Sequence, residues 1–333
     1  MNKPNHSDCT ELAFSLYLRF RGIAEPLAAM RTYLGMASAS EDAVLSFSDK
    51  LQRAFNWHFY NNNGLIRDSP WIPGKRTSEK RFDDLLTRVT KDLQRWGRQA
   101  DDDVLEALLE TTGRIMHHIQ DMCTPAHVVP VYHDPLFKDH YESYIEQYAR
   151  KIEAHLQDGD TPGPTGDRLK VFVRRDEISA AIAGHSRGSL RDSLKSLYEG
   201  SAQETLALLR DGAVTLYCNG EPGRFSLEQF WQPNDGNKKT GSDIFWLQKS
   251  AEDFGSFGPL GNNFGKMIFS VNRESGGEPV ETLYEGNPDE YLRVYRQLLK
   301  KTLLDSIVVL DIVAGFSSVF SDERSAEIAL SWN

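Results

Sequence analysis

Cysteine is scarce in this sequence, with three among 333 residues. Cys9, Cys123 and Cys218 are too few for a disulfide framework, and they lack the C-x2-C spacing of a structural zinc site. We therefore interpret them as structural residues. Basic residues are in the minority, because 38 Lys and Arg face 48 Asp and Glu and leave a net charge of -10. This charge argues against duplex nucleic acid as a partner, although an acidic pocket that holds metal ions can still bind a phosphate.

Long apolar runs are absent as well. The most apolar stretch, residues 307–320, is interrupted by Asp311 and Gly315 and is shorter than the roughly 18 residues that a membrane-spanning helix needs. Residues 1–12 contain no apolar segment with a small-residue cleavage site, so we expect that a leader is already absent or that export uses another route. A hydrophobic content of 40% fits one large or two modest globular domains. We predict a single catalytic domain over residues 1–333 and a monomer.

Helical periodicity dominates the chain, and convincing strands are scarce. Ser38 and Glu41 form a capping box that predicts a helix running towards residue 57. Asn287 before a proline predicts the start of a long helix. Residues 12–20 fit a strand and a helix equally well. Apolar stripes predict further helices over 82–96, 105–119 and 190–198. We therefore predict an all-α, multi-helix fold.

Residues 219–278 depart from this pattern, because they are dense in glycine and aromatic residues and show little periodicity. The aromatic residues are Phe230, Trp231, Phe245, Trp246, Phe254, Phe257, Phe264 and Phe269. We predict an irregular inserted loop region packed on the helical body. A long loop of this kind is often a lid or a binding loop and could touch a lipid surface, but a purely stabilising excursion is at least as consistent with the sequence.

Residues 184–188 spell GHSRG and match the G-x-S-x-G motif of α/β-hydrolases. One hypothesis is therefore an acyl hydrolase with Ser186 as its nucleophile. That motif follows a buried strand, whereas the preceding ISAAIA is poor in β-branched residues. In that fold the triad histidine also follows the serine, and no histidine lies beyond His185. We interpret the motif as a chance match.

Five of the nine histidines fall within residues 113–148. The centre of this stretch is His117-x3-Asp121-x3-Pro125-x-His127. Residues four apart lie one turn above each other on a helix, and a proline would stop that helix and return the last histidine towards the first two. Imidazole nitrogen and carboxylate oxygen are zinc ligands, and a carboxylate can bridge two ions. The motif thus predicts a metal site, although polar groups on a solvated helix face would give the same spacing.

Further motifs along residues 1–152 add to this stretch. They are His6, the Glu41-Asp42 pair, Trp57-His58-Phe59-Tyr60, the histidine and aspartate motif above and Tyr141-Glu142. Together, in this order and at these spacings, they resemble the zinc-dependent bacterial phospholipase C and single-strand nuclease superfamily. The resemblance favours a helix over residues 12–20, and it implies an all-α fold around three zinc ions at the base of a cleft.

The resemblance also implies ligands for the first two ions. The first ion would be held by His58, His117, Asp42 and Asp121. Asp121 would bridge to a second ion, which His6 and the amino group and carbonyl of Met1 would also bind. Relatives usually carry tryptophan at that terminus after leader removal, so this ligand depends on where the mature chain begins.

The third ion would take His127 and Glu142. Many relatives supply a histidine four residues before the glutamate, but Lys138 stands there in this chain. Some bacterial relatives instead use a loop histidine ahead of a D-x-[YF]-E segment, and His133 fits that variant. We predict His133 as the ligand and keep His140 as the second choice.

The resemblance finally implies phosphodiester hydrolysis, with Asp42 orienting or deprotonating the attacking water. The segment that begins at His58 is closer to the phospholipase pattern than to the nuclease pattern. Phe55 would then face a choline head group through a cation-π contact, although a core position is as consistent, and Lys138 would face water or the substrate phosphate.

We therefore predict a zinc-dependent phospholipase C that cleaves phosphatidylcholine or phosphatidylethanolamine to diacylglycerol and a phosphorylated head group. We expect it to contact membrane surfaces transiently and, as in the family, to be secreted. The alternatives are a single-strand nuclease of the same superfamily and a metal-stabilised binding protein without turnover.

Overall fold

The computed structural model describes most of the helical part of the chain and a smaller set of strands. The described residues are 3–23, 28–41, 58–60, 78–129, 131, 139–144, 173–185, 188–232, 255–275, 278–317, 319–320, 325 and 327–328. The helices are α1 (Lys3–Arg21), α2 (Ala28–Glu41), α4 (Ser78–Trp96), α5 (Asp102–Asp121), α6 (Pro125–Val128), α9 (Arg175–Ala183), α10 (Leu190–Asp211), the 3-10 helix η2 (Leu227–Gln229) and α11 (Pro288–Phe316). The strands are β1 (Ala213–Cys218), β2 (Glu221–Ser226), β3 (Trp231–Gln232), β4 (Ser256–Phe257), β5 (Ile268–Ser275) and β6 (Glu278–Glu285).

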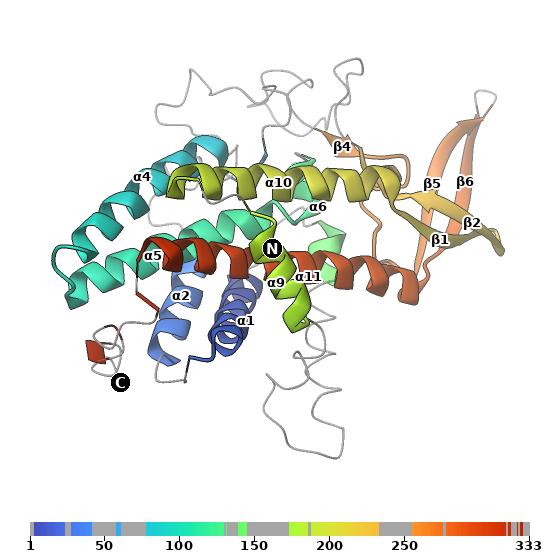
Figure 1. The fold of residues 1–333 in the computed structure, drawn as a ribbon. Coiled ribbons are helices and arrows are strands. Elements are labelled where there is room, and N and C mark those ends of the chain that lie inside the picture. Colours follow the sequence, from blue (N-terminus) through green and yellow to red (C-terminus); the bar gives the residue numbers. More distant parts are fainter. Residues whose placement is uncertain are drawn as a thin grey trace, which may run out of the picture.

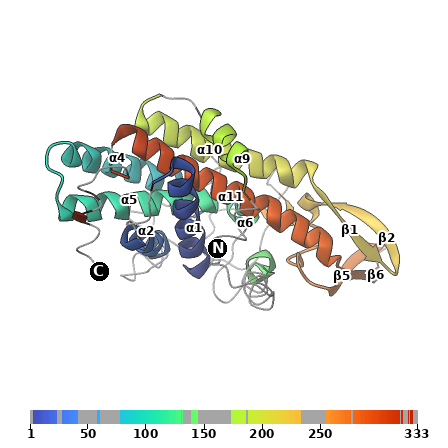
Figure 2. The same cartoon turned by 60° about the horizontal axis from the view of Figure 1, so that its bottom comes forward.

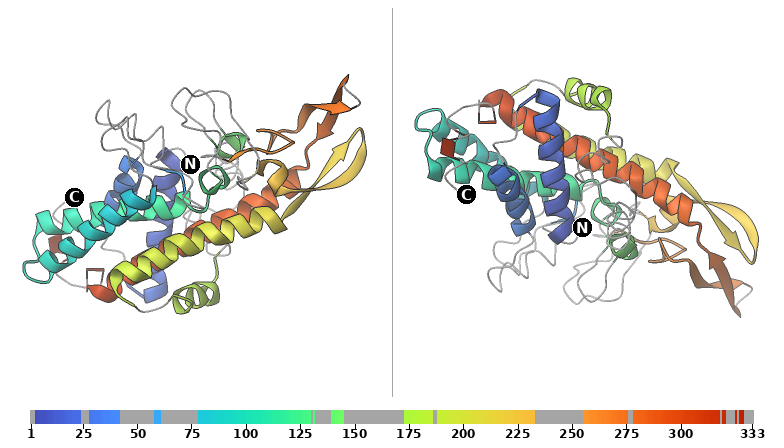
Figure 3. Two further views of the ribbon diagram at one scale, coloured as in Figure 1. Left: turned by 90° about the horizontal axis from the view of Figure 1, so that it is seen from above. Right: turned by 90° about the horizontal axis from the view of Figure 1, so that it is seen from below.

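Helix α5 lies at the centre of the helical body (Figure 1). It packs against α2, α4 and α11 and also contacts α1 and α10, while α1 lies against α2 and α11 (Figure 2). Gly113 permits the close approach of α2, because a Cβ atom at this position would lie 2.6 Å from the carbonyl oxygen of Leu34. Helices α10 and α11 run side by side along the body (Figure 3). The central helix is therefore enclosed by neighbours.

The prediction of an all-α fold is wrong, because the chain also forms a four-stranded antiparallel sheet. Its strand order is β2-β1-β6-β5, and it lies at the end of α10 and α11 (Figure 1). Strands β3 and β4 form a second, two-stranded sheet. Phe269 and Val271 alternate with Ser270 and Asn272, a short strand pattern, and in β5 Phe269 lies opposite the buried Tyr284 of β6.

The region 219–278 is accordingly more regular than predicted. Among its described aromatic residues, Phe230, Trp231, Phe264 and Phe269 are buried. The first three pack with one another and Phe264 contacts Tyr291 of α11, while Phe269 stacks on Tyr284 of β6. These four side chains stabilise the fold and are not available to a lipid surface. Phe245, Trp246 and Phe254 lie outside the described residues.

The predicted helices agree with the structure except at one start. The stripes over 82–96, 105–119 and 190–198 lie on α4, α5 and α10, and residues 12–20 belong to α1. Asn287 caps α11, since its side chain accepts from the amides of Asp289 and Glu290. The capping box at Ser38 is wrong, because Ser38 and Glu41 lie in the last turn of α2. The segment that was predicted to continue towards residue 57 lies outside the described residues.

The G-x-S-x-G match is not preceded by a strand. Residues 175–183 form α9, so the structural context of a nucleophile elbow is missing, as predicted from the sequence. Ser186 lies outside the described residues. Among the helices that the structure describes, none is long and apolar enough to cross a membrane.

Candidate metal centre

The carboxyl-terminal end of α5 and the turn after it form the base of the candidate site. The Nε2 atom of His117 lies 3.2 Å from Oδ2 of Asp121, one turn further along the helix. The helix ends at Asp121, and Pro125 starts the short helix α6, which carries His127. The Nδ1 atom of His127 lies 3.7 Å from Oδ1 of Asp121. The proline therefore coincides with the predicted reversal of the chain towards the first two residues of the motif.

Two further histidines reach Asp121 from other parts of the chain. His6 on α1 places its Nε2 atom 3.4 Å from Oδ1 of Asp121, and its ring stacks on that of His117 with centroids 3.9 Å apart. His58 places its Nδ1 atom 2.7 Å from Oδ2 of Asp121 and 3.3 Å from Nε2 of His117. One carboxylate thus stands among the ring nitrogens of four histidines.

These side chains are buried. Asp121 and His117 are 0% exposed, so the alternative of polar groups on a solvated helix face is wrong. Two groups bring three ligand atoms within 4.8 Å of one another: His6 with His117 and Asp121, and His58 with Asp121 and His127. Each buried cluster could hold a metal ion, and both use Asp121.

The resemblance implies that His58 and His117 bind the same ion. In the structure, His117 belongs to the first of these groups and His58 to the second. The rings of His58 and His117 nevertheless lie in hydrogen-bond range, so the described atoms keep both arrangements within reach. The predicted ligands Met1 and Asp42 lie outside the described residues, as do His133 and the predicted substrate contacts Phe55 and Lys138.

The charges of the site suit a cation. Burial alone would raise the pKa of the Asp121 carboxyl, but the neighbouring His127, His117 and His58 hold this pKa well below its usual range. Burial, reinforced by the neighbouring His117, lowers the pKa of His6 to about 4. At neutral pH the carboxylate is therefore ionised, and the His6 ring is neutral and can offer a lone pair.

Two buried atoms of the site, one nitrogen and one oxygen, show whether its residues fit a metal ion. Within the described part of the chain, Nε2 of His6 and Oδ1 of Asp121 have no hydrogen-bond partner. A buried polar group without a partner costs about 1–3 kcal/mol. A divalent cation between these two atoms would satisfy both, so the residues present fit a metal ion.

His127 and Glu142 form the described part of the predicted third site. The Nδ1 atom of His127 lies 3.0 Å from the backbone carbonyl oxygen of His58, and a carbonyl can only accept a hydrogen bond. The proton of a neutral ring therefore sits on Nδ1, and Nε2 carries the lone pair. That Nε2 atom lies 3.3 Å from Oε1 of Glu142. Although Nδ1 is also near Asp121, the carbonyl contact favours His127 as a ligand on its Glu142 side.

His140, the second choice for the third site, has different surroundings. It belongs to neither of the two buried groups found among the described residues. Its pKa is lowered by burial and by the nearby cation of Lys266, and its backbone amide donates to Oδ1 of Asn262. The positive charge of Lys266 thus acts on the His140 ring, which disfavours a second cation there.

Aromatic residues of the region 219–278 pack against the segment that carries Glu142. The sequence did not indicate this contact. The indole Nε1 of Trp231 donates to Oδ2 of the buried Asp139 at 3.2 Å. The ring of Tyr141 packs edge-on against Trp231 and against Phe264. The aromatic residues of this region thus fix the backbone next to a predicted ligand.

The contact between Trp231 and Asp139 leads to a prediction. Trp231→Phe should lower the free energy of unfolding by about 1–3 kcal/mol, because a buried carboxylate loses a donor. Urea denaturation of this variant, of Asp139→Ala and of the double variant measures the coupling between the two side chains. We expect the double variant to lose clearly less than the two single losses added together, and simple additivity would contradict a stabilising contact.

A second buried network lies beside the metal centre. The Glu41 carboxylate accepts from Arg81 at 2.5 and 2.9 Å and from Arg114 at 3.2 Å. His118 places Nε2 3.3 Å from Glu41 and Nδ1 3.3 Å from Ser78. Burial alone would raise the pKa of Glu41, but Arg81 and His118 hold it far below its usual range. Glu41 and His118 are therefore engaged in this network, which the sequence motifs did not predict.

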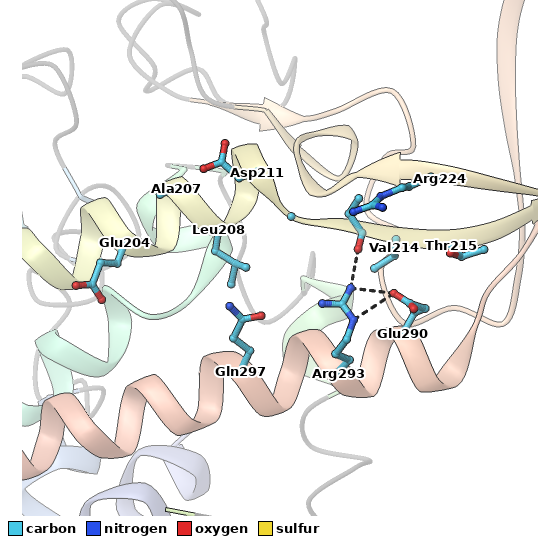
Figure 4. A pocket seen from close by; sticks show the side chains of 12 residues that line it. Glu204, Ala207, Leu208, Asp211, Val214, Thr215, Arg224, Glu290, Arg293 and Gln297 are labelled. Carbon is cyan, nitrogen blue, oxygen red and sulfur yellow. Dashed lines mark hydrogen bonds and ion pairs between the residues drawn. The ribbon is translucent and has the colours of Figure 1, made fainter. Parts of the chain in front are cut away.

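The structure also contains a cavity of about 580 Å³ between α10, β1 and α11 (Figure 4). Arg293 at its edge donates to the carbonyl oxygen of Ala213 and to Glu290. The described residues that line this cavity include no histidine or cysteine. It is therefore separate from the candidate metal centre.

Comparison of the chain with family models, with curated proteins and with solved structures gave no match.

Proposed function

We propose that this chain is a zinc-dependent phosphodiesterase that hydrolyses glycerophospholipids to diacylglycerol and a phosphorylated head group. One observation supports this activity above all. The buried Asp121 carboxylate has ring nitrogens of four histidines within 3.7 Å, and two of the facing atoms have no hydrogen-bond partner within the described residues. Imidazole and carboxylate ligands suit zinc, and sharing of Asp121 by two groups is consistent with two to three ions.

Bound zinc would supply Lewis acidity towards a phosphate oxygen and towards the attacking water. The protein contributes position and charge. Asp121 holds its negative charge in a buried place, and His6 and His127 direct Nε2 atoms towards Asp121 and Glu142. Asp42 would orient the water or take its proton. The water oxygen forms the new bond to phosphorus, and the bond from phosphorus to the diacylglycerol oxygen breaks, with a proton passing to that oxygen.

The choice of a phospholipid over a single-stranded nucleic acid comes from the sequence around His58 and from the net charge of -10. An acidic chain attracts a polyanion poorly. Phe55 and Lys138 would bind the head group and the phosphate. A single-strand nuclease would use the same ligands and remains the alternative within this chemistry.

A metal-stabilised binding protein is the second candidate function. The described ligand side chains are almost completely covered, with His117 and Asp121 at 0% and His58 at 6% exposure. Such buried ligands suit a structural zinc site, in which protein fills all four positions, as well as a catalytic site, which keeps one position open for water or substrate. Turnover separates the two functions.

The test is to identify the products from separate incubations with phosphatidylcholine vesicles, phosphatidylethanolamine vesicles and single-stranded DNA. We expect diacylglycerol together with phosphocholine or phosphoethanolamine. Nucleotides from the DNA alone would support the nuclease. A zinc-containing chain that releases no product from any of the three would support the binding protein and sink the proposed activity.

A further inference from the structure

Gln120 lies between the candidate ligands His117 and Asp121 in the sequence of α5, and its side chain contacts α1 and α11. Its side chain is 0% exposed and connects three elements. The Oε1 atom lies 2.7 Å from Nδ1 of His6 on α1. The Nε2 atom donates to Oγ1 of Thr10 at 2.9 Å and to Oγ of Ser306 on α11 at 3.3 Å. All three polar contacts of this small network are thus buried within the helical body.

The orientation of the Gln120 amide determines which nitrogen of His6 carries the proton. The amide nitrogen can only donate, and two hydroxyl oxygens accept from it. In this orientation the amide oxygen, which can only accept, faces Nδ1 of His6, and the proton of a neutral ring then lies on Nδ1. The lone pair of the neutral ring then lies on Nε2, which faces Oδ1 of Asp121 at 3.4 Å. This Nε2 atom is buried and has no hydrogen-bond partner in the described part of the chain.

We propose that Gln120 is a positioning residue that fixes the tautomer and the ring orientation of His6 for a metal ion shared with Asp121. This role rests on the metal centre of the proposed function. An outer hydrogen bond to the second nitrogen of a ligating histidine raises its basicity and holds its ring, and its loss typically costs about 10- to 100-fold in metal affinity. Thr10 and Ser306 act one step further out, because their hydrogen bonds hold the Gln120 side chain against His6.

Three variants test this role through zinc affinity, measured on the full chain by competition with a chromogenic chelator. Gln120→Met keeps the length of the side chain but removes the acceptor, and we expect zinc affinity to fall about 10- to 100-fold. Gln120→Glu keeps an acceptor oxygen, so affinity should be kept or raised. Thr10→Val removes one of the two groups that hold the amide, and an intermediate loss is expected.

Thr112→Val is the matched control. Its hydroxyl is buried on the same helix and donates to the carbonyl oxygen of Leu108 at 2.7 Å, away from the histidines. This variant should lose some stability and keep its zinc affinity. The wild-type chain must first bind zinc, since a chain without zinc refutes the proposed function as a whole.

The outcomes for Gln120 are separate from that failure. If wild-type protein binds zinc and Gln120→Met binds it equally well, the positioning role is refuted. Equal losses in Gln120→Met and Gln120→Glu would also refute it, because they would show that packing alone matters. If Gln120→Met does not fold, Thr10→Val decides, and unchanged affinity in that variant overturns the role.

Discussion

Asp121→Asn is expected to cause the largest loss of any single substitution in this chain. The change keeps the size of the side chain but removes the negative charge that four histidines surround. Both candidate metal groups use Asp121, so both should be affected together. Metal affinity should fall by more than about 100-fold, because loss of an outer partner alone already costs about 10- to 100-fold. Phospholipid hydrolysis should fall to the level of metal-free protein.

The control for this prediction is His118→Ala. His118 is buried next to His117, but its two ring nitrogens face Glu41 and Ser78. We expect this variant to be less stable and to retain its zinc, which atomic absorption on the purified proteins measures. If His118→Ala loses the metal while His117→Ala and Asp121→Asn keep it, the assignment of the helix face is wrong.

His133→Ala is expected to have the second largest effect. The predicted third ion has two candidate ligands among the described residues, His127 and Glu142, whose Nε2 and Oε1 atoms lie 3.3 Å apart. Two protein ligands are fewer than the three that catalytic zinc sites usually have, and His133 supplies the missing imidazole in this account. The variant should lose about one zinc ion per chain and most of its phosphodiesterase activity.

Two neighbours provide controls for His133. His140→Ala should keep its zinc, because the positive charge of Lys266 acts on this ring and His140 belongs to neither buried group of the described chain. Lys138→Ala should change substrate affinity, measured as KM, more than metal content. Loss of an ion in His140→Ala with full zinc in His133→Ala would show that the helix, and not the loop, carries the third imidazole.

The local features of the site could be predicted from the sequence. The spacing of His117 and Asp121 sets them one turn apart on a helix, and a proline stands where the chain turns to bring back His127. These relations depend on residues close in the chain. The convergence of His6 and His58 on Asp121 is a long-range contact, and only the order of motifs in a resembling family suggested it.

Other parts could not be predicted because they depend on what packs against them. The apolar and polar alternation of β5 is short, and its pairing with β6 requires the whole sheet. Glu41 contacts Arg81, which lies 40 positions further along the chain, and Arg114, which lies 73 positions further. Nothing in the sequence distinguishes Trp231 from the other aromatic residues of its region, because its hydrogen bond to Asp139, at 3.2 Å, joins distant parts of the chain.

Zinc content measured together with phosphatidylcholine hydrolysis tests the central claim most directly. The purified chain should contain two to three zinc ions, and removal of the metal with a chelator should abolish release of diacylglycerol. Added zinc should restore both the metal content and the activity, since a clustered metal site is the source of the nucleophile in this account. Metal-free protein that hydrolyses phosphatidylcholine at an undiminished rate would contradict it.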